Sequence, residues 1–255
     1  MTQQRTQTLL STTLSVTSLF AIALSWETMV RLRLAPYQIP TLDRVLAEFR
    51  NSPNAYASAG MDTLAEAFVG FLLGNSIGFL LAVLMSYSRT AQRTIAPYAV
   101  ALKATPIIAM SPLIVAWFGM GFWSKAICGA IVSFFPVVVQ VPKAFQRVPQ
   151  DLLELFAALE ASGRQTFFYL KLRHASPEIL DALKTASTLS VVGALIGEFI
   201  SPSQGVGKLL AYAIANAWGA QLVAATIVAA VIGICFFGII HIAQVLLVRW
   251  EPETV

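Results

Sequence analysis

Charged residues are scarce in this sequence. Lysine, arginine, aspartate and glutamate make up 12% of its 255 residues, whereas hydrophobic residues make up 57%. An ordinary soluble domain is about 25% charged, and the mean hydropathy of +0.72 points the same way. The shortage of charge excludes a soluble globular domain and predicts an integral membrane protein.

Cysteine and histidine are also rare, with two of each. Cys128 and Cys235 stand inside apolar runs, where small buried side chains are expected and not a disulfide or a metal pair. His174 and His241 fall far apart in the expected topology, and no cluster of cysteine, histidine or carboxylate residues has metal-ligand spacing. The sequence therefore predicts no catalytic residue, no metal site and no cofactor in this chain.

The sequence also lacks a nucleotide-binding loop. The segment GVGKLL at 205–210 contains a Gly-Lys pair, but Pro202 stands where a phosphate-binding loop needs an earlier glycine and Leu209 where it needs serine or threonine. Nucleic acid is not an expected partner either. The net charge of +4 is explained by lysine and arginine flanking membrane spans.

Long hydrophobic runs are what the sequence has in abundance. A helix needs about 20 mainly apolar residues to cross a hydrocarbon core of about 30 Å. We expect an all-α polytopic membrane protein with about six transmembrane helices, in which residues 1–255 form a single transmembrane domain. The candidate spans lie at about 9–30, 62–87, 95–118, 123–142, 179–200 and 221–248.

The N-terminal part carries two further expectations. Residues 1–25, with Arg5 near their start, fit either a cleaved signal peptide or a retained first helix, and the spans that follow favour the retained helix. Next, Thr41 is a candidate N-cap of a short interfacial helix. The apolar residues that share one face of this helix are Leu42, Val45, Leu46 and Phe49.

Positive charges indicate the orientation. With the N-terminus inside, nine lysine and arginine residues fall on the cytoplasmic side and six outside, among them Lys125. Because positive residues are enriched in cytoplasmic loops, this bias places both termini and the segment 155–183 in the cytoplasm.

Glycine recurs every fourth residue in two of the spans. Gly70, Gly74 and Gly78 form one row, and Gly193 and Gly197 form another. Small residues at this spacing let helix backbones approach closely. The rows predict a compact bundle and not a functional site.

Two charged residues within spans are open to two interpretations each. The run ALKATPIIAMSPLIVAWFG at 101–119 contains Lys103, Pro106 and Pro112, and its prolines predict a bent or broken helix. Lys103 either faces a pathway that this broken helix lines or extends to a nearby interface. Glu198 either lies on the transport path or at a gate, or it pairs with a cation or a helix end near the outer interface.

A polar insert interrupts the hydrophobic runs at LFAALEASGRQTFFYLKLRHASPEILDAL, residues 155–183. It combines two short amphipathic pieces, a glycine and a cluster of basic residues. Such an insert between spans predicts a cytoplasmic surface on which a partner docks. An ordinary basic loop is the alternative.

Over about residues 37–250 the sequence resembles the permease subunits of type I ABC importers. It is most similar to the branch for nitrate, sulfonate, taurine and bicarbonate, which includes importers of thiamine-pyrimidine and riboflavin precursors. The resemblance implies the type I importer permease fold and import of a small solute, either an organic anion or a heterocyclic precursor. Besides the insert, it is carried by PYQIPTLDRVLAEF, TLAEAFVGFLLGNSIGFLLAVLMSYS, ATPIIAMSPLIVAWFGMGFWSKA, FFPVVVQVPKAFQRVPQDLLEL and GALIGEFISPSQGVGKLLAYA.

The resemblance also implies partners and a location. The chain would work with two ATPase subunits, which carry ATP and Mg, with a second permease copy as a homodimer or heterodimer, and with an extracytoplasmic substrate-binding protein. It would be a multi-pass protein of the bacterial inner membrane, surrounded by lipid, and would not itself be an enzyme.

In that family a cytoplasmic coupling loop, here about residues 151–173, docks into the ATPase. Leu172 matches its conserved leucine, but Glu160 stands where a glycine is expected and Arg173 where a proline is expected. Either Gly163 takes over the turn, or Glu160 lengthens the helix before it. These departures also leave open a partner permease whose loop is closer to the pattern. The docking residues that the resemblance implies are Glu154, Ala157, Ala161, Gly163, Arg164, Gln165, Thr166 and Phe167.

We expect the translocation pathway between two permease copies, lined from the third and fifth spans, because broken helices and polar groups at depth are tolerated where they line a cavity. Two other functions stay open. One is an ion-coupled secondary carrier with Lys103 and Glu198 as its coupling pair, and the other is a non-transporting membrane scaffold. The pathway residues that we expect are Lys103, Pro106, Met110, Ser111, Pro112, Ser190, Gly193 and Glu198.

Overall fold

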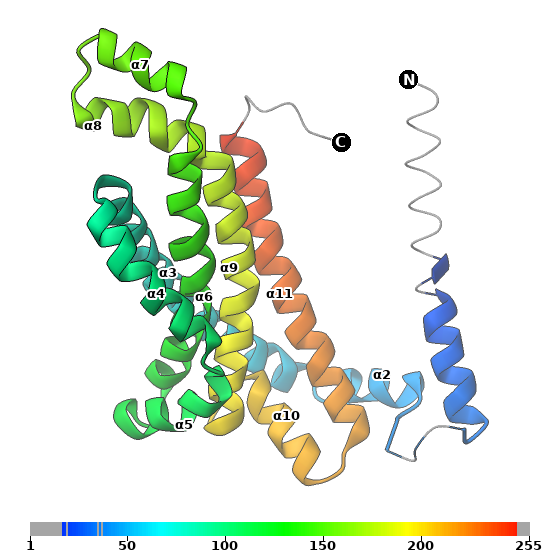
Figure 1. Cartoon of the computed structure of the whole chain (residues 1–255). Coiled ribbons are helices and arrows are strands. Elements are labelled where there is room, and N and C mark those ends of the chain that lie inside the picture. Colours follow the sequence, from blue (N-terminus) through cyan, green and yellow to red (C-terminus); the bar gives the residue numbers. More distant parts are fainter. Residues whose placement is uncertain (1–16, 19, 35, 37, 249–255) are drawn as a thin grey trace, which may run out of the picture.

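A computed structural model describes residues 17–18, 20–34, 36 and 38–248, and all regular secondary structure within them is helical (Figure 1). The predicted all-α class is therefore confirmed. The elements are α2 (Leu42–Asn51), α3 (Pro53–Tyr87), α4 (Arg89–Ala104), α5 (Ile107–Phe118), α6 (Phe122–Gln146), α7 (Gln150–Ala158), α8 (Gly163–Gln165), the π-helix η1 (Thr166–Lys171), α9 (Leu172–Ile200), α10 (Val206–Ala215) and α11 (Gly219–Leu247).

Four helices of the described part are long and apolar enough to cross a membrane. They are Pro53–Tyr87, Phe122–Gln146, Gly163–Ile200 and Gly219–Leu247, and the bent pair α4–α5 brings the number to five if it forms one span. Residues 20–31 are helical, but much of the expected first span at 9–30, and of the candidate signal peptide, lies outside the described residues. The predicted interfacial helix is present as α2.

The expected break in the third span lies at Pro106. Helix α4 ends at Ala104, Pro106 is the N-cap of α5, and the two helices meet at 98°. Pro112 lies inside α5 without ending it. A proline disfavours the helical conformation of the residue before it, and Thr105, which precedes Pro106, is extended with φ of −80° and ψ of 121°.

The glycine rows pack as the sequence predicts. A Cβ atom on Gly74 would lie 2.3 Å from the carbonyl oxygen of Ala130 on α6, and one on Gly193 would lie 2.5 Å from the carbonyl oxygen of Cys128. Both glycine rows thus face α6, with α3 on one side and α9 on the other. These three helices form the centre of the bundle (Figure 1).

The remaining elements lie at opposite ends of this bundle. Helices α7 and α8 extend beyond one end, whereas α2, α5 and α10 lie near the other (Figure 1). We name these the α7–α8 end and the α2–α10 end.

Candidate functional site

The turn between α7 and α8 is made by Glu160 itself. Helix α7 ends at Ala158, and Glu160 has φ of 55°, in the left-handed region. Its amide donates to the Ala157 carbonyl, and the amide of Ala161 donates to the Phe156 carbonyl, both at 3.0 Å. These two hydrogen bonds together form the Schellman motif, in which glycine usually takes the left-handed position.

Both expectations for this turn were therefore wrong. Gly163 does not take over the turn, because it is the first residue of α8, and Glu160 does not lengthen α7. The motif ends the helix through its backbone hydrogen bonds, and a glutamate is tolerated there at a cost of about 1–2 kcal/mol in conformational energy.

Replacing Glu160 with glycine should stabilise this turn, because glycine has no Cβ to strain the left-handed conformation. We expect the backbone amides of 159–162 to exchange with solvent several-fold more slowly, corresponding to about 1 kcal/mol. Hydrogen–deuterium exchange measures this locally. Glu160→Ala is the matched control, since it removes the carboxylate and keeps the Cβ; equal protection in both variants would contradict the prediction.

A capping box begins the second half of the loop. The Ser162 hydroxyl accepts from the Gln165 amide at 3.3 Å, and the Gln165 side-chain oxygen accepts from the Ser162 amide at 2.8 Å. The Ser-x-x-Gln spacing is visible in the sequence and could have predicted this helix start. The helix then continues from Gly163 through Ile200, and Pro177 lies inside it without ending it.

An aromatic cluster attaches the loop to the bundle. Phe167 is buried, and its ring lies 5.4 Å from the rings of both Tyr87 and Phe145, at the ends of α3 and α6. Phe167 was expected at the centre of a docking surface. The structure instead places it as the anchor of the π-helical segment, since its ring faces inward.

The outer side of the loop exposes large apolar side chains. Tyr169 is 70% exposed, Leu159 is 69% exposed and Phe168 is 51% exposed. Arg164 lies 5.8 Å above the Phe168 ring, and with Ser162, Gln165 and Tyr169 these two residues line an open hollow. In the sequence, large apolar residues inside a polar insert are the signal that could have identified Leu159, Phe168 and Tyr169.

Only two of the other expected docking residues line this hollow. Arg164 and Gln165 line it, and Thr166, whose hydroxyl donates to the Ser162 carbonyl, is half-buried. On the α7 side of the turn, Glu154 and Ala157 are exposed and Ala161 is half-buried, and Gly163 is exposed at the start of α8.

A second feature is a cavity of about 390 Å³ at the α4–α5 corner. Lys103, Thr105 and Pro106 line it from the corner, and α6 and α9 form its other walls, including Gln140 and Thr185. The wall residues of α6 and α9 come from the middle of these helices. The structure thus brings two of the expected pathway residues, Lys103 and Pro106, to one cavity.

The other expected pathway residues are not in this cavity. Met110 is half-buried, Pro112 is exposed on α5, and Ser111 is buried. Ser190 is buried and donates to the Ser187 carbonyl within α9. Gly193 is packed against α6, so within this chain it serves helix contact.

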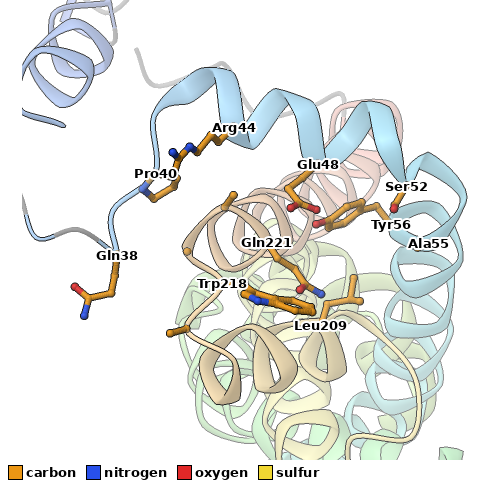
Figure 2. A pocket seen from close by; sticks show the side chains of 13 residues that line it. Gln38, Pro40, Arg44, Glu48, Ser52, Ala55, Tyr56, Leu209, Trp218 and Gln221 are labelled. Carbon is orange, nitrogen blue, oxygen red and sulfur yellow. The ribbon is translucent and has the colours of Figure 1, made fainter. Parts of the chain in front are cut away.

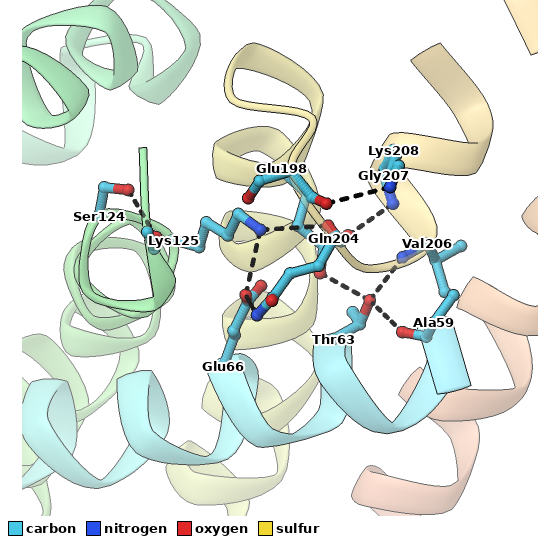
Figure 3. A network of polar contacts seen from close by, with 12 residues as sticks. Ala59, Thr63, Glu66, Ser124, Lys125, Glu198, Gln204, Val206, Gly207 and Lys208 are labelled. Atoms are coloured by element: carbon cyan, nitrogen blue, oxygen red, sulfur yellow. Dashed lines mark hydrogen bonds and ion pairs between the residues drawn. The ribbon is translucent and has the colours of Figure 1, made fainter. Parts of the chain in front are cut away.

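Glu198 belongs to a buried polar network at the α2–α10 end (Figure 3). Its carboxylate accepts from the Thr63 hydroxyl at 2.6 Å and from the Gly207 amide at 2.5 Å, at the start of α10. The amide of Val206 donates to the Thr63 oxygen at 2.9 Å. Of the two interpretations of Glu198, the structure agrees with pairing to a helix end. The dipole of α10 favours a negative charge at this position.

The same network contains an ion pair that the sequence did not predict. Lys125 is fully buried, and its Nζ lies 3.2 Å from Glu66 Oε1 and 3.1 Å from the Gln204 carbonyl (Figure 3). The Gln204 amide also donates to Glu66, at 3.0 Å. The expectation that Lys125 lies among the outer loop charges was wrong, because α3 and the 201–205 turn cover it.

Two glycines of GVGKLL make room for this network. A Cβ on Gly205, whose φ is 89°, would lie 2.1 Å from Glu198 Oε1, and one on Gly207 would lie 2.5 Å from the Glu198 Cβ. These glycines superficially suggested a phosphate loop. They are needed here because a side chain at either position would overlap Glu198.

A cavity of about 540 Å³ opens beside α2 at the same end (Figure 2). Arg44, Glu48 and Tyr56 line one side, and Trp218 and Gln221, at the start of α11, line the other. Charged, amide and aromatic side chains therefore converge on a concave surface at the α2–α10 end.

Comparison with known proteins gives a consistent result. The profile of the family described as "Binding-protein-dependent transport system inner membrane component" matches residues 74–251. The formylaminopyrimidine transport permease protein ThiX of Halalkalibacterium halodurans is 29% identical over 89% of this chain and 92% of its own length. The riboflavin transport system permease protein RibX of Chloroflexus aurantiacus is 30% identical over 75% of this chain and 71% of its own length.

Among solved structures, an amino acid ABC transporter with histidines superposes with a TM-score of 0.63 at 20% identity. The match covers 79% of this chain and 98% of that one. This similarity shows a shared fold.

Proposed function

The chain belongs to the family of binding-protein-dependent transport system inner membrane components, and from this premise we propose how its parts serve import. It is an ABC importer permease for a small solute. We propose that the ATPase docks on the 151–173 loop and transmits its movement through it. Solute passes beside the α4–α5 corner. The α2–α10 end then faces the substrate-binding protein.

The observation that carries the coupling proposal is the exposed hollow beside Phe168 and Tyr169, on a loop that ring contacts attach to the bundle. Arg164, Phe168 and Tyr169 face outward, while Phe167 fixes the same segment to α3 and α6 through ring contacts. A force applied to the outer side would reach three spans as a rigid-body movement, since η1 continues into α9. The loop thus combines a docking face with a mechanical connection.

The assembly that we propose contains two permease copies and two ATPase subunits, which bind ATP and Mg. The permease pair is a homodimer, or a heterodimer with a related chain. We propose that the α7–α8 end and both termini are cytoplasmic, because positive residues are enriched in cytoplasmic segments. The location is the bacterial inner membrane.

Disulfide crosslinking tests the docking face. In a Cys235→Ser background, Arg164→Cys and Tyr169→Cys should each crosslink to cysteines placed on the partner ATPase in a complex that imports solute. Tyr212→Cys is the control, because Tyr212 is 52% exposed on α10 at the opposite end. If neither loop position crosslinks in an active complex, the docking proposal fails.

Uptake by the purified chain separates this function from an ion-coupled carrier. The sequence has no nucleotide-binding loop, so we expect accumulation in liposomes only with ATP, the ATPase and the binding protein together. The carrier alternative requires Lys103 and Glu198 to act as a pair, but the structure places them in separate sites. Accumulation by the chain alone under a proton or sodium gradient would overturn our proposal.

A further inference from the structure

The cavity at the α4–α5 corner contains two polar groups that have no partner in the described part of the chain. Lys103 and Gln140 line the cavity and are exposed. Neither makes a hydrogen bond or ion pair within the described ranges, whereas the other polar lining residues, Thr105 and Thr185, donate to carbonyls of their own helices at 3.1 Å. An ammonium group and an amide are thus available to a ligand.

The charge of the cavity has one sign. Lys103 is the only titratable residue in the described lining, so no carboxylate there balances it. A lysine beside the middle of membrane-spanning helices costs about 2.5–3.5 kcal/mol on insertion scales unless it faces water or a counter-charge. An anionic ligand would supply that counter-charge, whereas a cationic ligand would be repelled.

The rest of the lining is apolar and includes an aromatic ring. Ile107, Ile131, Val132, Phe135 and Leu189 face the same space. Such walls bury a hydrocarbon or ring portion of a ligand and do not favour a small inorganic anion, which has no apolar surface to bury. The lining therefore selects for an acidic group attached to an apolar body.

A neighbouring cavity of about 430 Å³ shows the contrast. Leu73, Leu102, Phe118, Ile127 and Phe134 are among its lining residues, and none of the side chains that line it is polar or charged. Both cavities border the α4–α5 helices and share Ile131 and Phe135. Of these two cavities, only the Lys103 cavity has polar lining residues, so it is the one of the two that suits a hydrophilic solute.

We propose that the Lys103 cavity is a binding site for a small organic anion, in which the ammonium of Lys103 and the amide of Gln140 hold a carboxylate or sulfonate and the Phe135 side holds its apolar part. This inference rests on the proposed import function and deepens it, because it gives the permease its own selectivity for charge. The site lies beside the middle of two membrane-spanning helices, α6 and α9, so we commit to a free solute as the ligand.

Ligand-observed NMR with a matched ring series tests the site. The probes are benzenesulfonate, benzamide and benzylamine, which share a ring and differ in charge, and the protein is the full chain in phosphatidylcholine nanodiscs. We expect saturation transfer to benzenesulfonate, with little transfer to benzylamine. Lys103→Gln should weaken benzenesulfonate binding about tenfold, and Gln140→Leu should weaken it several-fold.

Lys143→Gln is the matched control, because Lys143 is an exposed lysine of α6 outside the cavity lining. It should leave benzenesulfonate binding unchanged. Equal binding in wild type and Lys103→Gln, or a preference for benzylamine or benzamide, would overturn the proposal. Displacement of benzenesulfonate by added phosphatidylglycerol would overturn it in favour of a lipid site. Since the measurement needs neither ATP nor partners, its outcome is independent of whether import is ATP-driven.

Discussion

Replacing Lys125 with methionine should lower the free energy of unfolding by about 3–5 kcal/mol, the usual effect of removing one partner from a buried ion pair. Methionine fills a similar volume, so the loss is electrostatic and not a matter of packing. Glu66 is fully buried and would keep the Gln204 amide as a donor and its contact with the Glu198 carboxyl. Among the described residues Lys125 is the only cation in contact with Glu66, so the variant leaves the buried carboxylate without a counter-charge.

Thiol reactivity provides the measurement. Cys128 and Cys235 are the two cysteines of the chain; Cys128 is buried and Cys235 is exposed. In a Cys235→Ser background, modification of Cys128 during denaturation therefore reports loss of the folded bundle. We expect Lys125→Met to expose Cys128 at markedly lower denaturant concentration.

Two further variants separate the ion pair from a general effect of losing a lysine. Lys143→Met, on an exposed side chain of the same helix, should change stability by no more than about 0.5 kcal/mol. The double variant Glu66→Gln with Lys125→Met should recover part of the loss, because the buried carboxylate is then neutral. If Lys125→Met proved as stable as the wild type, the network would have no role in holding the α2–α10 end together.

Replacing Gly74 with alanine should destabilise the bundle by about 1–3 kcal/mol, the usual cost of overpacking. The added Cβ would meet the Ala130 carbonyl at 2.3 Å and the Ser133 hydroxyl at 2.7 Å. A backbone carbonyl cannot rotate away as a flexible side chain can, so α3 and α6 must separate locally. The same Cys128 assay measures the change.

Gly233→Ala is the control for helix propensity. Gly233 lies inside α11, and a Cβ there would have no neighbour within 4 Å. Because alanine is favoured over glycine in a helix by about 1 kcal/mol, this variant should be neutral or more stable than the wild type. If Gly74→Ala behaved in the same way, the close contact between α3 and α6 would not be required.

Local sequence features predicted much of the fold because they act over a few residues. The glycine spacing predicted close helix packing, although not that α6 is the partner of both rows, and the two prolines of 101–119 predicted a break but not which proline makes it. The polar insert predicted the α7–α8 loop. Its exact turn was not predictable, since the left-handed conformation of Glu160 follows from backbone hydrogen bonds that glutamate does not usually favour.

The sequence by itself determined the membrane class, the order of the spans and the family, because hydrophobic run length and motif spacing are properties of consecutive residues. Only the tertiary structure decided which polar groups meet. It paired Lys125 with Glu66, turned Phe167 inward and left Lys103 facing a cavity. The physical reason is that the burial and partner of a charged or aromatic side chain depend on which helix faces come together, and residues far apart in the chain supply those faces.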